Sequence, residues 1–290
     1  MFAGALTALV TPFRDDKLDE KALRAIVAEQ IDSGIDGLGP SGTTGECASL
    51  SHEEYARLLS IVIDETRGRV PVIAGAGSAS TAHTIELAKI AQKLKADGLL
   101  VVVPYYYKPS QEGLYAHFAA VAKAVPLPTI LYNIPGRCGV DLSLATLERI
   151  AGIEGIVGIK ESTGTVQRSA EIATRFGERF TILSGDDALA LPIMAMGGHG
   201  VISVASNVVP REVSKLVDLF RAGDLAGARA QHQRLSPLYE ALFIESNPGP
   251  VKWAMGMRGM MASEIRLPFV LPTEASQQRI RAALNLVGLR

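Results

Sequence analysis

The sequence has only two cysteines, no long hydrophobic run and no excess of charge of either sign. Cys47 and Cys138 have neither CxxC spacing nor a neighbouring histidine cluster, so two free thiols are expected rather than a disulfide framework or a zinc site. The longest apolar stretches, such as residues 99–103, are much shorter than the roughly 20 residues of a membrane-spanning helix. We therefore expect no membrane segment.

The charges are nearly balanced, with 29 lysines and arginines against 30 aspartates and glutamates and a formal net charge of −1. Proteins that bind nucleic acids or anionic membranes normally carry a basic excess, which this chain lacks. The N-terminal segment is apolar but has no basic stretch of the kind that opens a secretory signal peptide. These observations favour small or neutral partners and a cytoplasmic location.

What the chain does contain is a repeated alternation of short apolar runs and longer amphipathic segments. Each run is rich in β-branched residues, is bounded by glycine or proline and precedes a segment with helical periodicity. The spacing of roughly 25 to 35 residues is what a strand and its crossover helix require. We predict eight strands: ALTALV near residue 5, IDGLGP near 35, VPVIAGAG near 70, GLLVVVP near 98, PTILYNIP near 128, GIVGIK near 155, FTILSGD near 180 and GVISVAS near 200.

The segments between these runs carry helix start and stop signals. Ser51 and Glu54 have the spacing of a capping box, which predicts a helix that ends before Gly68. Asp19 precedes another amphipathic segment, and Gly34 follows it at the position where a left-handed residue commonly ends a helix.

Eight repeats of strand and helix predict an α/β protein with a (β/α)8 TIM barrel. A doubly wound open sheet is the alternative, but its first loop would be expected to carry GxGxxG, which is absent here. We assign residues 1–222 to the barrel. Residues 223–290 show only helical patterns, and we expect them to form a C-terminal helical appendage.

Active sites of such barrels lie at the C-terminal ends of the strands, where Lys160 ends an apolar run. Burial lowers the pKa of a lysine, and a neutral amine can attack a ketone to form a Schiff base. Two other interpretations remain open from this residue alone. The side chain could extend to the solvent at the rim, or it could pair with Glu161.

Further polar residues are predicted at the same end of the barrel. A turn with two hydroxyls between glycines could bind a carboxylate or relay protons, phenols could relay protons, and an arginine after a Pro-Gly turn could bind a carboxylate. Each has a simpler interpretation: a β-turn with a helix cap, aromatic packing, or a solvated loop. All of these residues are expected at the same end of the barrel as Lys160, which favours an active site there. The residues are Thr43, Thr44, Tyr105, Tyr106, Tyr107, Tyr132 and Arg137.

The sequence gives little support for a metal site. The five histidines fall mostly in predicted helices. Asp186 and Asp187 could hold a cation, but we interpret them as helix caps. We therefore predict neither a metal nor an organic cofactor.

Several motifs in one order resemble those of the dihydrodipicolinate synthases, a family of lysine-dependent aldolases that use pyruvate. The resemblance covers essentially the whole chain. The motifs are GTTGE at 42–46, PYYYKPSQEGLY at 104–115, YNIPGR at 132–137, GIKES at 158–162, LSGDD at 183–187, GGHGVISV at 197–204 and NPGPVKWAM at 247–255.

The resemblance implies a lyase that condenses pyruvate with L-aspartate 4-semialdehyde in lysine and diaminopimelate biosynthesis. It implies that Lys160 forms the Schiff base and that Tyr132 exchanges protons in a relay with Thr43 and with Tyr106 from a neighbouring subunit. It also implies a homotetramer built from two dimers. The residues implied to hold the substrates are Thr44, Arg137 and the backbone at Gly185 and Ile202.

Two rival functions are kept. An N-acetylneuraminate lyase or sugar-acid aldolase of the same superfamily is disfavoured by Arg137, which those relatives usually lack. A non-catalytic keto-acid-binding barrel would be expected to have lost Lys160 or Tyr132, and both are present.

The resemblance also implies a site for feedback inhibition by lysine. Where inhibited relatives have an amide and a carboxylate, this chain has Ala79 and His83, which predicts weak or absent inhibition unless Ser78, Ser80 or Glu86 compensates. The candidate effector residues are Ala48, His52, Tyr55, Ala79, His83 and Tyr105.

Overall fold

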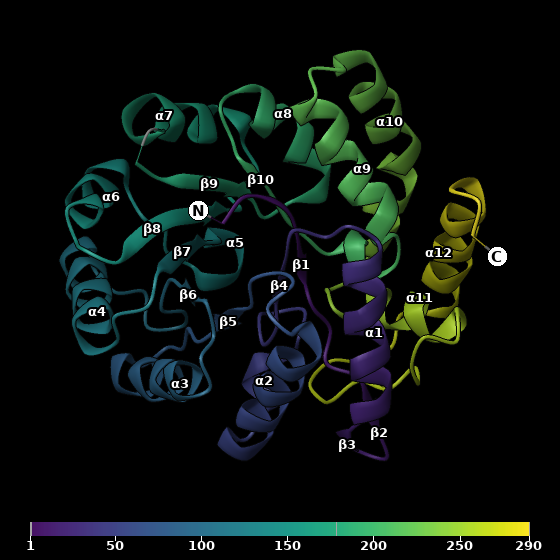
Figure 1. Cartoon of the computed structure of the whole chain (residues 1–290), viewed down its shortest axis with the longest axis horizontal. Coiled ribbons are helices and arrows are strands. Elements are labelled where there is room, and N and C mark those ends of the chain that lie inside the picture. The colour runs from purple at the N-terminus through teal and green to yellow at the C-terminus, as the bar shows by residue number, and fades with distance from the viewer. Residues whose placement is uncertain (1, 178, 290) are drawn as a thin grey trace.

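The computed structural model describes residues 2–177 and 179–289. Parallel strands form one sheet whose order is β4-β1-β10-β9-β8-β7-β6-β5. A parallel bridge between Leu38 and Val72 brings the two edge strands together and closes the sheet into a barrel. The predicted (β/α)8 barrel is therefore confirmed (Figure 1).

The eight strands of the sheet coincide with the eight predicted runs. Their side chains alternate between the barrel interior and the surrounding helices, so apolar residues are needed on both faces. The strands are β1 (Gly4–Ala8), β4 (Gly37–Gly39), β5 (Ile73–Gly75), β6 (Gly98–Val102), β7 (Thr129–Asn133), β8 (Ile156–Glu161), β9 (Thr181–Ser184) and β10 (Gly200–Ser203); β2 (Phe13–Arg14) and β3 (Lys17–Leu18) form a separate hairpin.

The barrel helices lie outside the sheet, and their predicted caps are confirmed. Ser51 and Glu54 form the reciprocal capping box of α2, Asp19 accepts from the backbone of α1, and Gly34 has the left-handed conformation that ends α1. The helices are α1 (Glu20–Asp32), α2 (His52–Thr66), α3 (Thr81–Lys93), α4 (Gln111–Ala124), α5 (Pro135–Cys138), α6 (Leu144–Ala151), α7 (Val166–Phe176), α8 (Ala190–Ala195) and α9 (Pro210–Arg221), with short 3-10 turns at Cys47–Ser49, Asp187–Leu189 and Ala205–Asn207.

Three further helices follow the barrel and lie together on one side of it (Figure 1). They are α10 (Leu225–Leu242), α11 (Gly249–Met257) and α12 (Glu274–Leu286). Leu235, Leu242 and Ile280 belong to the same hydrophobic core as Leu6 and Val201 of the barrel. The helical nature of this region is as predicted, whereas its separation from the barrel as a unit stays a prediction. None of the helices in the described residues is long and apolar enough to span a membrane.

Candidate active site

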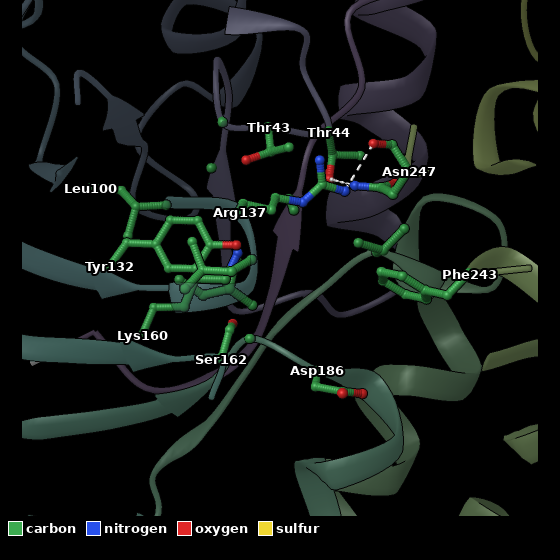
Figure 2. Close-up of a pocket in the computed structure, with 17 residues that line it drawn as sticks. Thr43, Thr44, Leu100, Tyr132, Arg137, Lys160, Ser162, Asp186, Phe243 and Asn247 are labelled. Carbon is green, nitrogen blue, oxygen red and sulfur yellow. Dashed lines mark hydrogen bonds between the residues drawn. The ribbon is translucent and has the colours of Figure 1, made fainter. Parts of the chain in front are cut away.

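Lys160 and Tyr132 lie side by side inside the barrel because they are register partners on β8 and β7. Both side chains are buried, and the Lys160 Nζ lies 4.2 Å from the centroid of the Tyr132 ring. Lys160 is only 5% exposed, which excludes the interpretation that it extends to the solvent. Figure 2 shows the two side chains together in one pocket.

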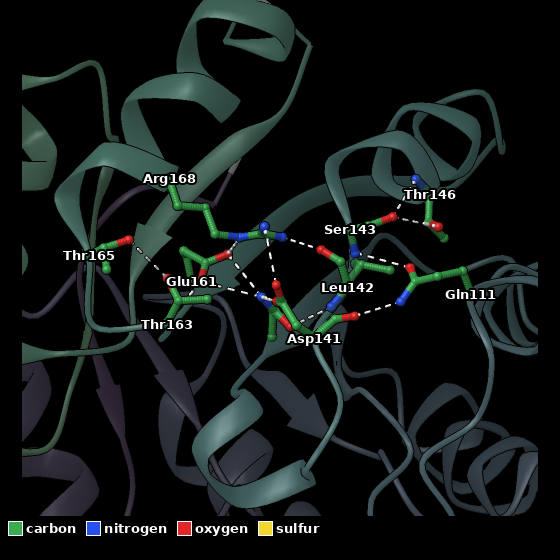
Figure 3. A network of polar contacts seen from close by, with 10 residues as sticks. Gln111, Asp141, Leu142, Ser143, Thr146, Glu161, Thr163, Thr165 and Arg168 are labelled. Carbon is green, nitrogen blue, oxygen red and sulfur yellow. Dashed lines mark hydrogen bonds and ion pairs between the residues drawn. The ribbon is translucent and has the colours of Figure 1, made fainter.

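Lys160 does not pair with Glu161 either, because successive residues of a strand point to opposite faces. The Glu161 carboxylate faces the helices, where it accepts from Arg168 Nε at 3.1 Å and from the Thr163 backbone N–H at 2.8 Å. Asn133 joins this network from β7 and donates to Asp141 Oδ1 at 2.8 Å. Figure 3 shows Arg168, Glu161 and Asp141 together in the network. The network thus fixes the end of β8 from outside and leaves Lys160 without a carboxylate partner among the ion pairs of the described chain.

Burial lowers the pKa of Lys160 to about 8, and the positive charge of Arg137 acts in the same direction. The Asp187 carboxylate opposes this shift, because a nearby negative charge stabilises the ammonium form. Burial also raises the pKa of Tyr132 to about 12, although Ser162, Arg137 and Thr43 lower it to a smaller extent. The pocket therefore combines an amine that is readily deprotonated with a phenol that keeps its proton.

The predicted hydroxyl turn lies across the pocket from Lys160. Thr43 and Thr44 both line the pocket, and Thr44 Oγ1 accepts from Asn247 Nδ2 at 3.0 Å. Arg137 lines it too and donates to the Asn247 carbonyl at 3.1 Å. Asn247 comes from the segment between α10 and α11, so the C-terminal region completes the pocket wall (Figure 2).

Gly185 lies behind Lys160, where a side chain does not fit. A Cβ there would lie 1.8 Å from Ser162 Oγ and 2.9 Å from Lys160 Cε. Its backbone N–H already donates to the Glu161 carbonyl at 2.8 Å, so this N–H is not free for a substrate. Of the predicted backbone contacts, this leaves those through the Gly185 carbonyl and through Ile202, which also lines the pocket.

Asp187 is not the simple helix cap that we expected. Asp186 does cap a short 3-10 turn, by accepting from the Ala188 backbone N–H at 2.9 Å. The Asp187 carboxylate is instead buried and accepts from Ser203 Oγ at 2.5 Å and from two backbone N–H groups at the end of β10. The two residues are adjacent in the sequence and were given the same role, but Asp187 is buried at 2% exposure whereas Asp186 is only partly buried and lines the pocket.

Tyr106 does not line the pocket of its own chain and is 81% exposed. Its predicted action in a neighbouring subunit therefore stays a prediction. Conversely, several pocket residues received no role from the sequence: Ile134, Ser162 and Asn247 belong to quoted motifs, whereas Leu100 and Phe243 had no signal beyond being apolar or aromatic. Ser162 Oγ is buried without a hydrogen-bond partner in the described chain.

The candidate effector residues gather outside the pocket, around the start of α2 and α3. His52 and His83 face each other, with 2.9 Å between their Nε2 atoms. Tyr55 is buried at 2% exposure and its hydroxyl has no partner in the described residues. Tyr105 approaches the backbone of Ala79. Lysine binding in this region stays a prediction.

Residues 1–286 match the model of the dihydrodipicolinate synthetase family. A 4-hydroxy-tetrahydrodipicolinate synthase of Pelobacter propionicus is 50% identical over 289 residues, covering 100% of both chains.

Solved structures agree with this similarity. The 4-hydroxy-tetrahydrodipicolinate synthase of Methylacidiphilum fumariolicum superposes with a TM-score of 0.98 at 44% identity, covering 99% of this chain and 96% of that one. A chloride-inhibited dihydrodipicolinate synthase of Acinetobacter baumannii complexed with pyruvate gives a TM-score of 0.98 at 42% identity and full coverage of both chains.

Proposed function

Because the chain belongs to the dihydrodipicolinate synthetase family, we propose that it condenses pyruvate with L-aspartate 4-semialdehyde to give 4-hydroxy-tetrahydrodipicolinate. The observation that supports this most directly is Lys160, a buried amine with a lowered pKa inside a pocket with Tyr132, Thr44 and Arg137. The pocket has a volume of about 140 Å³, which suits a small acid. The related A. baumannii structure was solved with pyruvate.

The reaction begins with attack of the neutral Lys160 amine on the keto carbon of pyruvate. Tyr132 donates a proton to the former carbonyl oxygen, water leaves, and an iminium ion forms. The iminium acidifies the methyl group, which loses a proton to give an enamine. The enamine carbon then adds to the aldehyde carbon of the semialdehyde, whose oxygen becomes the 4-hydroxyl after protonation.

Ring closure releases the enzyme. The amino group of the semialdehyde attacks the iminium carbon, and Lys160 leaves as an amine while the new cyclic imine forms. Every step is a proton transfer or an iminium exchange, so this scheme uses groups of the protein and substrates and requires no cofactor. Proton movement through Thr43, Tyr132 and the partner's Tyr106 is the relay that the scheme needs.

Substrate carboxylates require donors, and the pocket offers two kinds. Thr44 lies at the turn opposite Lys160, where its hydroxyl can donate to pyruvate while it accepts from Asn247. Within residues 2–177 and 179–289, the Arg137 guanidinium donates only to Asn247, so its other N–H groups suit the carboxylate of the semialdehyde. Arg137→Ala should weaken use of the semialdehyde by about 2 to 4 kcal/mol while pyruvate still binds.

The proposal is tested by two linked measurements on purified protein. Borohydride reduction with pyruvate should add the mass of a reduced pyruvate to the peptide containing Lys160, and a coupled assay should show turnover only when both pyruvate and aspartate semialdehyde are present. Trapping without turnover on the semialdehyde, but with cleavage of a sugar acid, would favour the rival aldolase. An adduct on another lysine would refute the Schiff-base role.

The proposed assembly is a cytoplasmic homotetramer, a dimer of dimers, in which Tyr106 serves the neighbouring active site. Its exposure in the single chain leaves it available for that contact. Mixing inactive Tyr106→Phe and Lys160→Ala protomers should restore part of the activity in hybrid dimers. Hybrids that form without activity would contradict the shared site.

We also propose that lysine inhibits this enzyme weakly or not at all. Ala79 supplies no hydrogen-bond acceptor in its side chain, and His83 is already engaged with His52 and with Ser78 Oγ, at 3.1 Å. Losing a charged and a neutral hydrogen bond costs roughly 1.5 to 3 and about 1 kcal/mol, respectively, which together correspond to about 100-fold weaker binding. Half-maximal inhibition at submillimolar lysine would refute this.

A further inference from the structure

His52, His83 and Glu86 bring three metal-ligating side chains together outside the active-site pocket. His52 is the first residue of α2, and His83 and Glu86 lie three residues apart on α3, hence on one face of that helix. One ligand atom from each lies within 4.8 Å of the other two. All three are exposed, so a cation from the solvent can reach them.

We propose that these three side chains bind one divalent transition-metal ion of the zinc class. Two imidazoles and a carboxylate are a donor set that suits Zn²⁺, Co²⁺ and Ni²⁺ better than Mg²⁺ or Ca²⁺, which prefer oxygen ligands alone. Water would complete the coordination in the open positions.

The distance between the two histidine donors is close to that of a bound site. Zn–N bonds of about 2.0 to 2.1 Å at a tetrahedral angle separate two nitrogens by about 3.3 Å. The two Nε2 atoms are 2.9 Å apart, so a small rotation of the exposed His52 ring opens enough space for the ion. The metal then replaces the hydrogen bond in which one imidazole N–H donates to the nitrogen of the other.

The His83 ring is already held in a ligating orientation. Its Nδ1 lies 3.1 Å from Ser78 Oγ, and the Ser80 backbone N–H donates to that same oxygen at 3.2 Å. Ser78 is buried at 7% exposure. An outer partner on Nδ1 directs the Nε2 lone pair toward a metal, which is the arrangement found around metal-bound histidines.

A bound cation would also change the charge of the surface where the family resemblance implies a lysine site. It would place positive charge beside His52 and His83, where the ammonium groups of lysine would need acceptors. The metal proposal does not depend on the proposed reaction, because it concerns residues that do not line the active-site pocket.

The test is calorimetric titration of Zn²⁺ into the chelator-treated full-length protein, with Co²⁺ absorption as a second readout. We expect one ion per chain and a Co²⁺ spectrum of a low-coordinate site with nitrogen ligands. Ser78→Ala removes the outer hydrogen-bond partner of His83 and should weaken Zn²⁺ binding 10- to 100-fold. His52→Gln and His83→Gln each remove a ligand, so they should weaken Zn²⁺ binding by about 100-fold or more. Glu86→Gln should weaken it less.

His232→Gln is the matched control, because His232 lies in α10 and outside this cluster. It should bind Zn²⁺ as the wild type does, and Zn²⁺ should raise the melting temperature of both proteins but not of His83→Gln. Absence of a one-to-one isotherm in the wild type overturns the proposal. The proposal is also overturned if the Zn²⁺ affinity of His52→Gln or of His83→Gln falls by less than threefold. Both outcomes are independent of whether the enzyme condenses its proposed substrates.

Discussion

Lys160 and Lys252 are both buried, and each ammonium nitrogen lies over an aromatic ring, at 4.2 Å from the centroid of Tyr132 and 4.4 Å from that of Phe13. They differ in their partners. Lys252 Nζ donates to Glu46 Oε1 at 2.5 Å, with both side chains fully buried, whereas Lys160 faces a pocket and has no ion pair in the described chain.

We propose that this difference separates a structural lysine, Lys252, from a reactive one, Lys160. Burial lowers the pKa of both residues, but at Lys252 the Glu46 carboxylate acts against that shift by direct contact. The more distant Asp187 opposes it only partly at Lys160. Burial alone therefore does not distinguish the two lysines, whereas an open pocket and the lack of a bound carboxylate do.

The Lys252 pair also holds the active-site turn in place. Glu46 directly follows Gly42–Gly45 and accepts from the Arg266 backbone N–H at 2.9 Å as well as from Lys252. Asn247 contacts Thr44 of the same turn. The C-terminal helices thus support one side of the pocket through Lys252, while the barrel strands present Lys160 from the other.

The largest expected effect is the loss of chemistry at Lys160. Lys160→Met should lower kcat by about 10⁴-fold or more, because the Schiff base cannot form. Mass mapping after borohydride reduction should show the adduct on Lys160 in the wild type and none on Lys252. Circular dichroism of the variant checks that its fold is intact, and an adduct on Lys252 would remove the distinction between the two lysines.

The next effect concerns stability. Lys252→Met leaves the Glu46 carboxylate buried without its counter-ion, which should lower the free energy of unfolding by about 3 to 5 kcal/mol. Lys252→Met combined with Glu46→Gln should recover part of this loss, because no charge is then buried alone.

The exposed pair of Arg57 and Glu20 is the control for that experiment, with 2.6 Å between Nη2 and Oε2. Arg57→Met should change stability by no more than about 1 kcal/mol, because solvent screens an exposed pair. Denaturant unfolding gives all the values. If Lys252→Met costs no more than Arg57→Met, Lys252 does not have the structural role assigned here.

A third prediction uses pH. With a pKa of about 8, Lys160 is charged below pH 8 and neutral above it, so the rate of pyruvate trapping should rise about tenfold per pH unit and level off above about pH 8. At pH 7 its neutral fraction is about 300 times that of a lysine of ordinary pKa. Single-turnover trapping across pH measures this, and a midpoint near 10 would show that burial does not activate Lys160.

The barrel and the position of Lys160 could be predicted from the sequence. The periodic apolar runs predicted the barrel, and a lysine at the end of an apolar strand indicated Lys160, because strand alternation is a local pattern. Lys252 lies in an equally apolar segment, but its partner Glu46 is 206 residues away and no periodicity connects them. For the same reason the sequence did not place Asn247 in the pocket or separate Asp187 from Asp186.

The smallest expected effect comes from Asp187, the charge that acts on Lys160 without contacting it. When ionised, the Asp187 carboxylate stabilises the ammonium form and raises the pKa of Lys160 against the effect of burial. Burial raises the pKa of Asp187 itself, while its hydrogen bonds from Ser203 and two backbone N–H groups lower it. Asp187→Asn should therefore lower that pKa, by less than about one unit because no ion pair is lost, and should move the midpoint of the trapping profile to lower pH. Asn keeps the shape but accepts fewer hydrogen bonds from Ser203 and β10, so the melting temperature is measured alongside. A midpoint that rises, or one that is unchanged in a variant of near-native stability, would show that Asp187 supports the fold without tuning the amine.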